Sequence, residues 1–184
     1  MRFVEHLSDL IRSPYDPDVV VIGDPTQLQH ISHVSAMILT CTPPDLNLVY
    51  QALKPGGQVW FIPSEDLGED TVSNLEDLGF EVRDTLYLAE DESDILYSPK
   101  ATVKEKTLGL DSNQKPHPTT KPVKLMSQVI RPDTLVLDPF MGSGTTGVAA
   151  VQVGADFIGI EQSNEYYEIA RNRVNAVNTK AWFE

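Results

Sequence analysis

Short apolar runs and amphipathic stretches alternate along most of the chain, which predicts alternating strands and helices. Runs rich in apolar residues are typical of buried strands at residues 19–22, 36–39, 58–62, 135–137 and 157–160, and the first of them is β-branched throughout. Segments with helical spacing predict helices at residues 46–53, 71–78, 121–130, 147–153 and 164–177. This order predicts an α/β fold built on a doubly wound, mostly parallel sheet.

Three further segments complete the predicted elements. Phe3, Leu7 and Leu10 have roughly helical spacing, so a short helix is predicted for residues 1–11. Lys54-Pro-Gly-Gly57 predicts a break between a helix and the next strand. Apolar runs at residues 80–82, 86–88 and 95–97 predict paired strands at one edge of the sheet.

The stretch from residue 134 to 161 combines a strand, a glycine turn, a helix and a second strand. Gly142 and Gly144 let backbone N–H groups approach a ligand closely, and the helix that follows offers unpaired donors. Thr145 and Thr146 are predicted N-caps of that helix. Glu161 ends the second strand, about 20 residues on, where a carboxylate suits two ribose hydroxyls. The third glycine of a dinucleotide site is absent, and the bare Gly-x-Gly is equally compatible with a structural turn.

Three motifs in this region resemble one enzyme family. Asp138-Pro-Phe-Met-Gly-Ser-Gly-Thr-Thr146 resembles the cofactor motif of S-adenosylmethionine-dependent DNA amino-methyltransferases, which modify adenine N6 or cytosine N4. His117-Pro-Thr-Thr-Lys-Pro122 is similar to a segment just upstream in the permuted, beta-type members, and Ile158-Gly-Ile-Glu161 to their acid-bearing strand. The resemblance is dense from about Lys100 to Val174. It implies the Rossmann-like class I methyltransferase fold in circularly permuted motif order.

The same resemblance implies a cofactor and a set of residues around it. The cofactor is S-adenosylmethionine, the product is S-adenosylhomocysteine, and no metal is required. The residues that match the family's cofactor side are Asp24, His117, Thr119, Lys121, Asp138, Pro139, Phe140, Gly142, Ser143, Gly144, Thr145 and Glu161. For Asp24, an ordinary cap of the next helix is the alternative interpretation.

The catalytic quartet is where the sequence departs from the family. In its members a strand ends in Asp, Asn or Ser, then Pro-Pro and an aromatic residue. The polar residue and a carbonyl hold the amino group of a flipped base, and the ring stacks on it. Here the quartet consists of Thr42, Pro43, Pro44 and Asp45. Asp45 cannot stack, so two hypotheses stay open: a working variant of the site, and a cofactor-binding chain that has lost transfer.

Length and composition limit the classes of protein. The 184 residues are predicted to form one methyltransferase domain, with a base-side half at 1–98, a basic linker at 99–120 and a cofactor half at 121–184. The single cysteine excludes an internal disulfide and a cysteine-based metal cluster. Because there is no long apolar run and no signal-peptide pattern, a cytoplasmic protein of a bacterial or phage-infected cell is expected, without membrane attachment.

The formal net charge of −13 is unfavourable for a DNA partner, because phosphate contacts supply most non-specific affinity. The basic residues, however, gather in one segment. Seven of the fourteen Lys and Arg residues lie between Lys100 and Arg131, against only Glu105 and Asp111. A basic face beside the cofactor site is one interpretation, and a solvated connector is the other. The predicted DNA contacts are Lys100, Lys104, Lys106 and Lys115.

The expected activity is methyl transfer to the exocyclic amino group of a flipped DNA base, adenine N6 in preference to cytosine N4, in a restriction–modification or phage setting. Residues 107–116 leave only ten positions where full-size relatives carry a target-recognition region. Low or short sequence specificity, or a second specificity-giving chain, is therefore expected. Permuted relatives are often dimers, so the resemblance also implies a homodimer. The alternatives are a cofactor-binding regulatory or partner subunit without transfer activity, and a methyltransferase for RNA or another acceptor.

Overall fold

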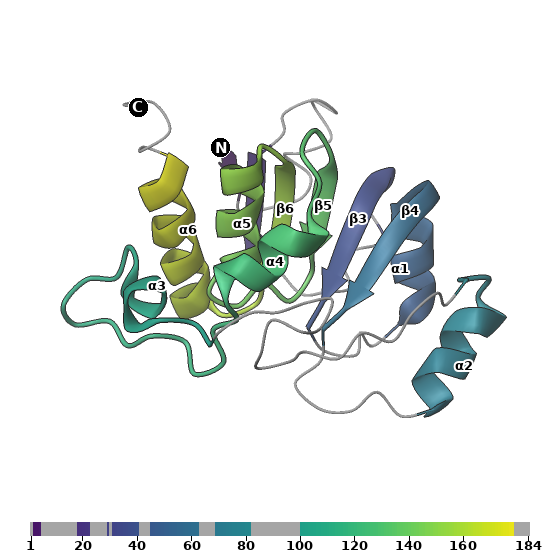
Figure 1. Cartoon of the computed structure of the whole chain (residues 1–184), viewed down its shortest axis with the longest axis horizontal. Coiled ribbons are helices and arrows are strands. Elements are labelled where there is room, and N and C mark those ends of the chain that lie inside the picture. Colours follow the sequence, from purple (N-terminus) through teal and green to yellow (C-terminus); the bar gives the residue numbers. More distant parts are fainter. Residues whose placement is uncertain are drawn as a thin grey trace.

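In the part of the chain that the structure describes, one parallel sheet of six strands forms the centre (Figure 1). The computed structural model describes residues 2–4, 18–22, 29, 31–40, 45–62, 69–81 and 100–178. The strands are β1 (Arg2–Val4), β2 (Asp18–Ile22), β3 (Val34–Leu39), β4 (Leu53–Phe61), β5 (Leu135–Asp138) and β6 (Asp156–Glu161). Their spatial order is β1-β2-β6-β5-β3-β4, and every pairing is parallel.

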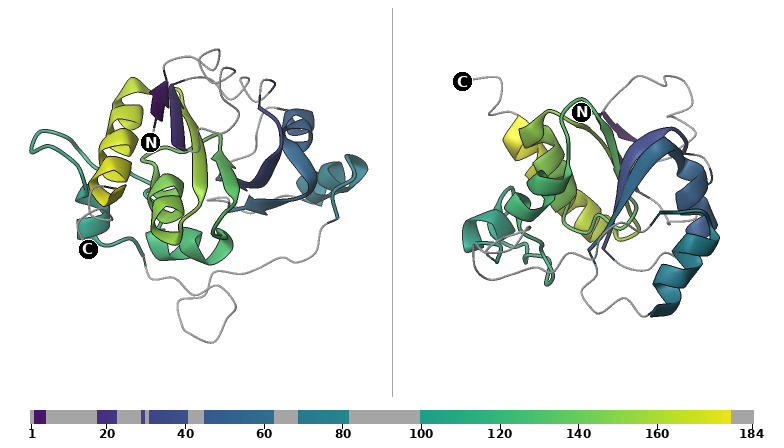
Figure 2. Two further views of the ribbon diagram at one scale, coloured as in Figure 1. Left: turned by 90° about the horizontal axis from the view of Figure 1, so that it is seen from above. Right: turned by 45° about the vertical axis from the view of Figure 1, so that its right-hand side comes forward.

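Helices cover both faces of this sheet. They are α1 (Leu46–Ala52), α2 (Glu69–Asp77), α3 (Val103–Thr107), α4 (Val123–Val129), α5 (Thr145–Val153) and α6 (Asn164–Asn178). In the views of Figures 1 and 2, α4, α5 and α6 lie on one face, and α1 lies on the other, against β4. The predicted α/β fold with a doubly wound, parallel sheet is confirmed.

Alternate side chains of β3 enter two separate apolar clusters. Ala36 and Ile38 belong to the cluster under α4, α5 and α6, whereas Met37 and Leu39 belong to the cluster that includes α1. A parallel strand that is buried on both faces has to be apolar at every position, which explains the continuous apolar run in this part of the sequence.

The strand order reverses at β5. Its neighbours are β6, which follows it in sequence, and β3, which precedes it by about a hundred residues. In open α/β sheets, ligands bind beyond the carboxyl ends of the strands where the strand order reverses in this way. The topology therefore places the expected site at the ends of β3, β5 and β6.

The predicted helix at residues 1–11 is wrong for its first residues, which form β1. Arg2 lies opposite Val19 and Val4 opposite Val21 in parallel register. An unpaired strand edge offers a row of backbone donors and acceptors, and this pairing outweighs a weak helical spacing in the sequence. The predicted strands at 86–88 and 95–97 lie outside the described residues, and Phe80 and Glu81 are not in a strand.

The predicted break at Lys54–Gly57 is also different in the structure. Strand β4 begins at Leu53, directly after α1, and Leu53 lies opposite Val34. The next paired residue is Gln58, opposite Ala36, so the intervening residues form an irregularity in the strand. Gly56 has a φ of 75°, which suits such a bulge. The helix ends where the sequence predicts, but the glycines interrupt the pairing inside a strand.

Candidate active site

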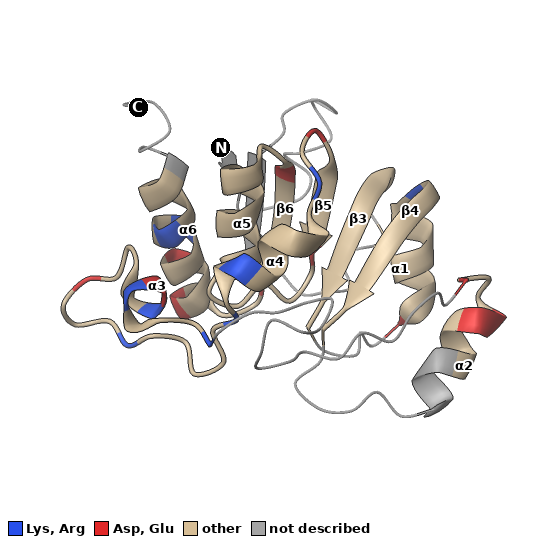
Figure 3. Ribbon diagram, in the orientation of Figure 1, with Lys and Arg blue, Asp and Glu red and all other residues tan. Residues whose placement is uncertain are grey.

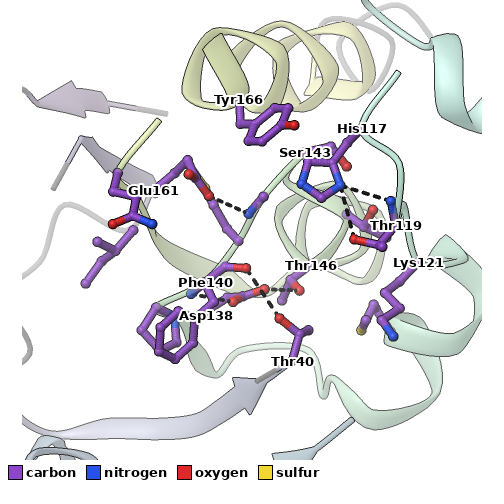
Figure 4. A pocket seen from close by; sticks show the side chains of 17 residues that line it. Thr40, His117, Thr119, Lys121, Asp138, Phe140, Ser143, Thr146, Glu161 and Tyr166 are labelled. Atoms are coloured by element: carbon purple, nitrogen blue, oxygen red, sulfur yellow. Dashed lines mark hydrogen bonds between the residues drawn. The ribbon is translucent and has the colours of Figure 1, made fainter. Parts of the chain in front are cut away.

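A cavity of about 380 Å³ opens at the carboxyl ends of β3, β5 and β6 (Figure 4). Ten of the predicted cofactor-side residues line it: His117, Thr119, Lys121, Asp138, Pro139, Phe140, Gly142, Ser143, Thr145 and Glu161. In Figure 4, His117, Thr119 and Lys121 lie on one side of the space and Glu161 on the opposite side. The fold thus brings the three motifs of the sequence around one cavity.

The structure shows two of the remaining predicted residues, and both lie outside the cavity wall. Gly144 is not part of the cavity wall; it packs on α6, where an added Cβ would lie 2.8 Å from the Cβ of Ala170. Asp45 stands at the start of α1. Four predicted residues lie outside the described part of the chain: Asp24, Thr42, Pro43 and Pro44.

Several lining residues were not singled out from the sequence. Thr40 follows β3 and its hydroxyl donates to the carbonyl of Phe140, with an O···O distance of 3.4 Å. Tyr166 also lines the cavity, whereas its neighbour Tyr167 is buried in the core. Adjacent positions on a helix point about 100° apart, so a Tyr-Tyr pair on an amphipathic helix predicts that one ring faces away from the core. That signal was available in the sequence.

Glu161 connects the end of β6 to the glycine loop. Its Oε2 accepts a hydrogen bond from the backbone N–H of Gly142 at 3.0 Å, and its Oε1 accepts from the N–H of Ser163 at 2.8 Å. A carboxylate has about four lone-pair positions. Two of them are therefore left for ligand donors on a side chain that lines the cavity.

Asp138 is the fully buried anchor of the loop that follows β5. Its Oδ1 accepts from the N–H of Phe140 at 3.0 Å, and its Oδ2 accepts from the hydroxyl of Thr146 at 2.5 Å. Burial raises the pKa of Asp138 to about 6; these two hydrogen bonds oppose the rise, and the nearby charge of Glu161 adds to it.

The prediction that Thr145 or Thr146 caps α5 is wrong. Gly144 occupies the N-cap position with a φ of 73°, and the two threonines form the first turn of the helix, where both are buried. Their hydroxyls bind tertiary partners instead: that of Thr146 donates to Asp138, and that of Thr145 accepts from Arg173. A hydroxyl can cap a helix only when the backbone conformation at the start of the helix places that hydroxyl next to the free N–H groups.

We expect Asp138 to make the protein less stable as the pH rises from about 4 to about 6. Between its ordinary pKa of 3.8 and its raised value of about 6, the folded state holds a proton that the unfolded state has released. The free energy of unfolding should therefore fall by roughly 3 kcal/mol across this window, and not change further above it. Urea unfolding at a series of pH values, compared with Asp138→Asn, isolates this contribution. A wild-type minus variant difference that stays constant with pH would contradict it.

His117 presents one ring nitrogen to the cavity side of the loop. The backbone N–H of Thr119 donates to its Nδ1 at 3.2 Å, and burial lowers the pKa of His117, with the charge of Glu161 opposing and that of Arg173 adding to this effect. The neutral ring is thus assigned its proton on Nε2. Nε2 lies 3.3 Å from where a Cβ of residue 142 would stand, and Gly142 has none. The ring also packs edge-on against Tyr166, with centroids 4.2 Å apart.

The carboxylate of Asp45 has a structural partner. Its Oδ1 accepts from the backbone N–H of Asn47 at 2.8 Å and from the side-chain amide of Asn47 at 3.0 Å, which makes Asp45 the N-cap of α1. Asp45, which stands where the family has its aromatic residue, therefore forms its hydrogen bonds with the first turn of α1.

Lys and Arg residues gather in and beside α3, at one end of the protein (Figure 3). Lys104 and Lys106 belong to α3, Lys100 precedes it, and Lys115 lies in the loop after it. Lys100, Lys104 and Lys115 are exposed and Lys106 is half-buried. The Thr-x-x-Glu signature of a capping box, Thr102 to Glu105, begins α3 and was not recognised in the sequence.

Two further findings concern metals and membranes. Within the described ranges, no three His, Cys, Asp or Glu side chains gather closely enough to hold a metal ion. The helices of the described part are too short or too polar to cross a membrane.

Comparisons with known proteins identify the chain's relatives. It is 41% identical over 90 residues to the type II methyltransferase M2.MboI of Moraxella bovis, which is 47% of this chain and 31% of that protein. It is 50% identical over 66 residues to the type II methyltransferase M2.DpnII of Streptococcus pneumoniae, which is 34% of this chain and 25% of that protein. The matched segments thus span less than a third of each curated relative.

The fold is also found in solved structures. The crystal structure of the M1.HpyAVI–SAM complex superposes with a TM-score of 0.56 at 23% identity, over 85% of this chain and 99% of that one. This likeness shows the shared class I methyltransferase fold. The model of the N6/N4 methyltransferase family, described as DNA methylase, matches residues 47–172, which include β4, β5, β6 and the part of the cavity wall from His117 to Tyr166. The chain therefore belongs to the N6/N4 DNA methylase family.

Proposed function

We propose that this chain binds S-adenosylmethionine and transfers its methyl group to the exocyclic amino group of a DNA base. The observation that carries this proposal is the cavity at the ends of β3, β5 and β6. Its wall combines the Asp138 loop, Glu161 and the segment from His117 to Lys121. Relatives in the same family are methyltransferases, and one solved neighbour is a complex with SAM.

The donors and acceptors of the cavity fit this cofactor. Glu161 keeps two lone-pair positions for the two hydroxyls of a ribose. Phe140, Met126 and Met141 supply apolar surface for a flat ring and an aliphatic chain. The Nε2–H of His117 adds a neutral donor near the loop. When bound, S-adenosylmethionine supplies a methyl group on a sulfonium, so the chain has only to bind and orient the two reactants.

The base would enter from the β3 side. Strand β3 leads through Thr40, on the cavity wall, toward the quartet that begins at Thr42. We assign the Thr42 hydroxyl and the Pro43 carbonyl to hold the amino group of a flipped base, with Pro44 shaping the turn. Asp45 is assigned to cap α1, because both of its recorded bonds go to Asn47. Adenine N6 is the preferred acceptor in this proposal.

The decisive experiment is transfer of a radiolabelled methyl group from S-adenosylmethionine to mixed-sequence single- and double-stranded DNA. Digestion to nucleosides identifies the modified base. Label in N6-methyladenine supports the proposal as stated, and label in N4-methylcytosine corrects the base. Absence of label on DNA, together with S-adenosylhomocysteine binding by calorimetry on the same sample, would contradict stand-alone transfer.

A second function is favoured by one observation, the carboxylate of Asp45 at the position of the stacking ring. A cofactor-binding partner subunit needs no platform for a base, so the residue is free to serve α1 alone. In that case, the labelled methyl group should be transferred only when a second, catalytic chain is added.

The basic end around α3 is proposed as the DNA-contacting surface, with Lys100, Lys104, Lys106 and Lys115 facing the phosphates. We expect Lys104→Gln to weaken binding to mixed-sequence DNA and to reduce the salt slope of log K by about 1, because one phosphate contact is lost. Fluorescence anisotropy at several salt concentrations measures both. The control is Lys54→Gln, an exposed lysine in β4, remote from α3, which should leave the slope unchanged. Equal slopes for wild type and Lys104→Gln would remove Lys104 from the surface.

A further inference from the structure

Arg173 on α6 is completely buried, which is unusual for a guanidinium. Taking a charged group out of water is costly unless hydrogen bonds compensate it. Burial lowers the pKa of Arg173 to about 10, and the charge of Glu105 opposes this shift, so the side chain stays charged at neutral pH. A buried charge of this kind is retained where its hydrogen bonds fix a conformation that apolar packing alone does not fix.

Its first contacts are with the glycine loop. Nη1 donates to the carbonyl oxygen of Ser143 at 2.6 Å, to the Ser143 hydroxyl at 2.7 Å and to the Thr145 hydroxyl at 3.2 Å. These two residues flank Gly144 and follow Gly142, both of which have positive φ angles. Glycines in that conformation restrict the backbone little by themselves, so a loop built on them needs external contacts to keep one shape.

Its second contact reaches α3. Nη2 donates to the backbone carbonyl of Glu105 at 3.1 Å. The carboxylate of Glu105 in turn accepts from the N–H of Val123 at 3.2 Å, at the start of α4 and directly after the His117–Pro122 segment. Thr120 of that segment lies 3.5 Å from the Ser143 hydroxyl. One guanidinium thus joins the glycine loop, the basic helix and, through Glu105, the opposite wall of the cavity.

The hydrogen-bond partners of Arg173 hold its side chain in place but carry no negative charge. All four recorded acceptors are carbonyl or hydroxyl oxygens, and in the described part of the chain its Nε has no hydrogen-bond partner. The planar, forked donor set of Arg reaches two elements at once, which the single ammonium of Lys cannot do.

We infer that Arg173 is the positioning residue of the proposed cofactor pocket: it holds Ser143 and Thr145 so that the loop and Glu161 face the ligand, and it fastens this loop to α3. The inference rests on the proposed function for the identity of the ligand only. The contacts of Arg173 do not depend on which molecule accepts the methyl group.

The test uses Arg173→Lys in the full chain, with calorimetric titration of S-adenosylhomocysteine. Loss of the forked contacts should weaken binding by about tenfold or more, as for loss of a hydrogen bond to a charged group, with a stoichiometry near that of the wild type. The matched control is Arg171→Lys, two residues away, whose partly exposed side chain pairs with Glu168; its affinity should be unchanged. A lower stoichiometry with unchanged affinity would mean that Arg173 serves only folding, and an unchanged affinity and stoichiometry would also overturn the inference.

Hydrogen exchange on the ligand-free protein separates this inference from the proposed function. In Arg173→Lys, amides of residues 139–147 and 102–107 should exchange faster, whereas those of β3 should not change. If the wild type binds no S-adenosylhomocysteine, the proposed function fails and the exchange pattern still decides the positioning role. If Arg173→Lys does not fold, Thr145→Val, which removes one acceptor at similar volume, should speed exchange in the loop. Unchanged exchange there would overturn the inference.

Discussion

Replacing Glu161 with Gln is expected to weaken S-adenosylhomocysteine binding by roughly 100-fold or more, the loss of two charge-assisted hydrogen bonds. The carboxylate fixes the loop through the Gly142 N–H and has two lone-pair positions left for ribose hydroxyls. In Gln one oxygen becomes an NH₂ group. Because each oxygen of Glu161 accepts a backbone N–H, this group faces a donor at either position, and it also removes an acceptor for the ligand. Isothermal titration calorimetry measures the change.

The control for this prediction is Glu165→Gln. Glu165 is exposed in the first turn of α6 and lies only four residues further on in the sequence, so the substitution removes the same charge from the surface nearby. Its effect on affinity should stay within about twofold, the size expected for a screened surface charge. If Glu161→Gln and Glu165→Gln behave alike, Glu161 does not bind the ligand, and the role assigned to the end of β6 is wrong.

Gly144→Ala is expected to destabilise the protein by roughly 3 kcal/mol and to impair the cavity as well. Gly144 has a φ of 73°, a conformation that costs an L-residue about 1–2 kcal/mol. The added Cβ would also lie 2.8 Å from the Cβ and 3.0 Å from the Cα of Ala170. The loop and α6 therefore have to move apart, which displaces Ser143 and Thr145 from Arg173. Urea unfolding gives the stability, and calorimetry gives the affinity.

The structure offers a control with the same backbone strain and no clash. Gly154 ends α5 with a φ of 78°, and a Cβ added there meets nothing within 4 Å. Gly154→Ala should cost only the conformational part, about 1–2 kcal/mol, and leave ligand affinity unchanged. The difference between the two variants measures the close approach of the loop to α6. Equal losses of stability in the two variants would show that the loop does not approach α6 closely.

The sequence by itself determined the order of most elements and ten of the residues that line the cavity. Continuous apolar runs such as that of β3 are required by strands buried on both faces, so period and residue type were sufficient to place them. The residues of the Asp138 loop and Glu161 form one motif because the glycine turn and the strand end are local features. Local chemistry also placed the end of α1 within one residue of Ala52, and the glycine at the end of α2.

The tertiary structure decided what each polar group binds. Thr146 could have been a cap by its position in the sequence, but its hydroxyl meets a buried carboxylate only because β5 and α5 pack together. Residues 2–4 became a strand because an edge of β2 was open to pairing. Arg173 gave no signal in the sequence, since its partners are thirty and sixty-eight residues away. Hydrogen bonds between distant segments depend on the packing of whole elements, and no local pattern encodes them.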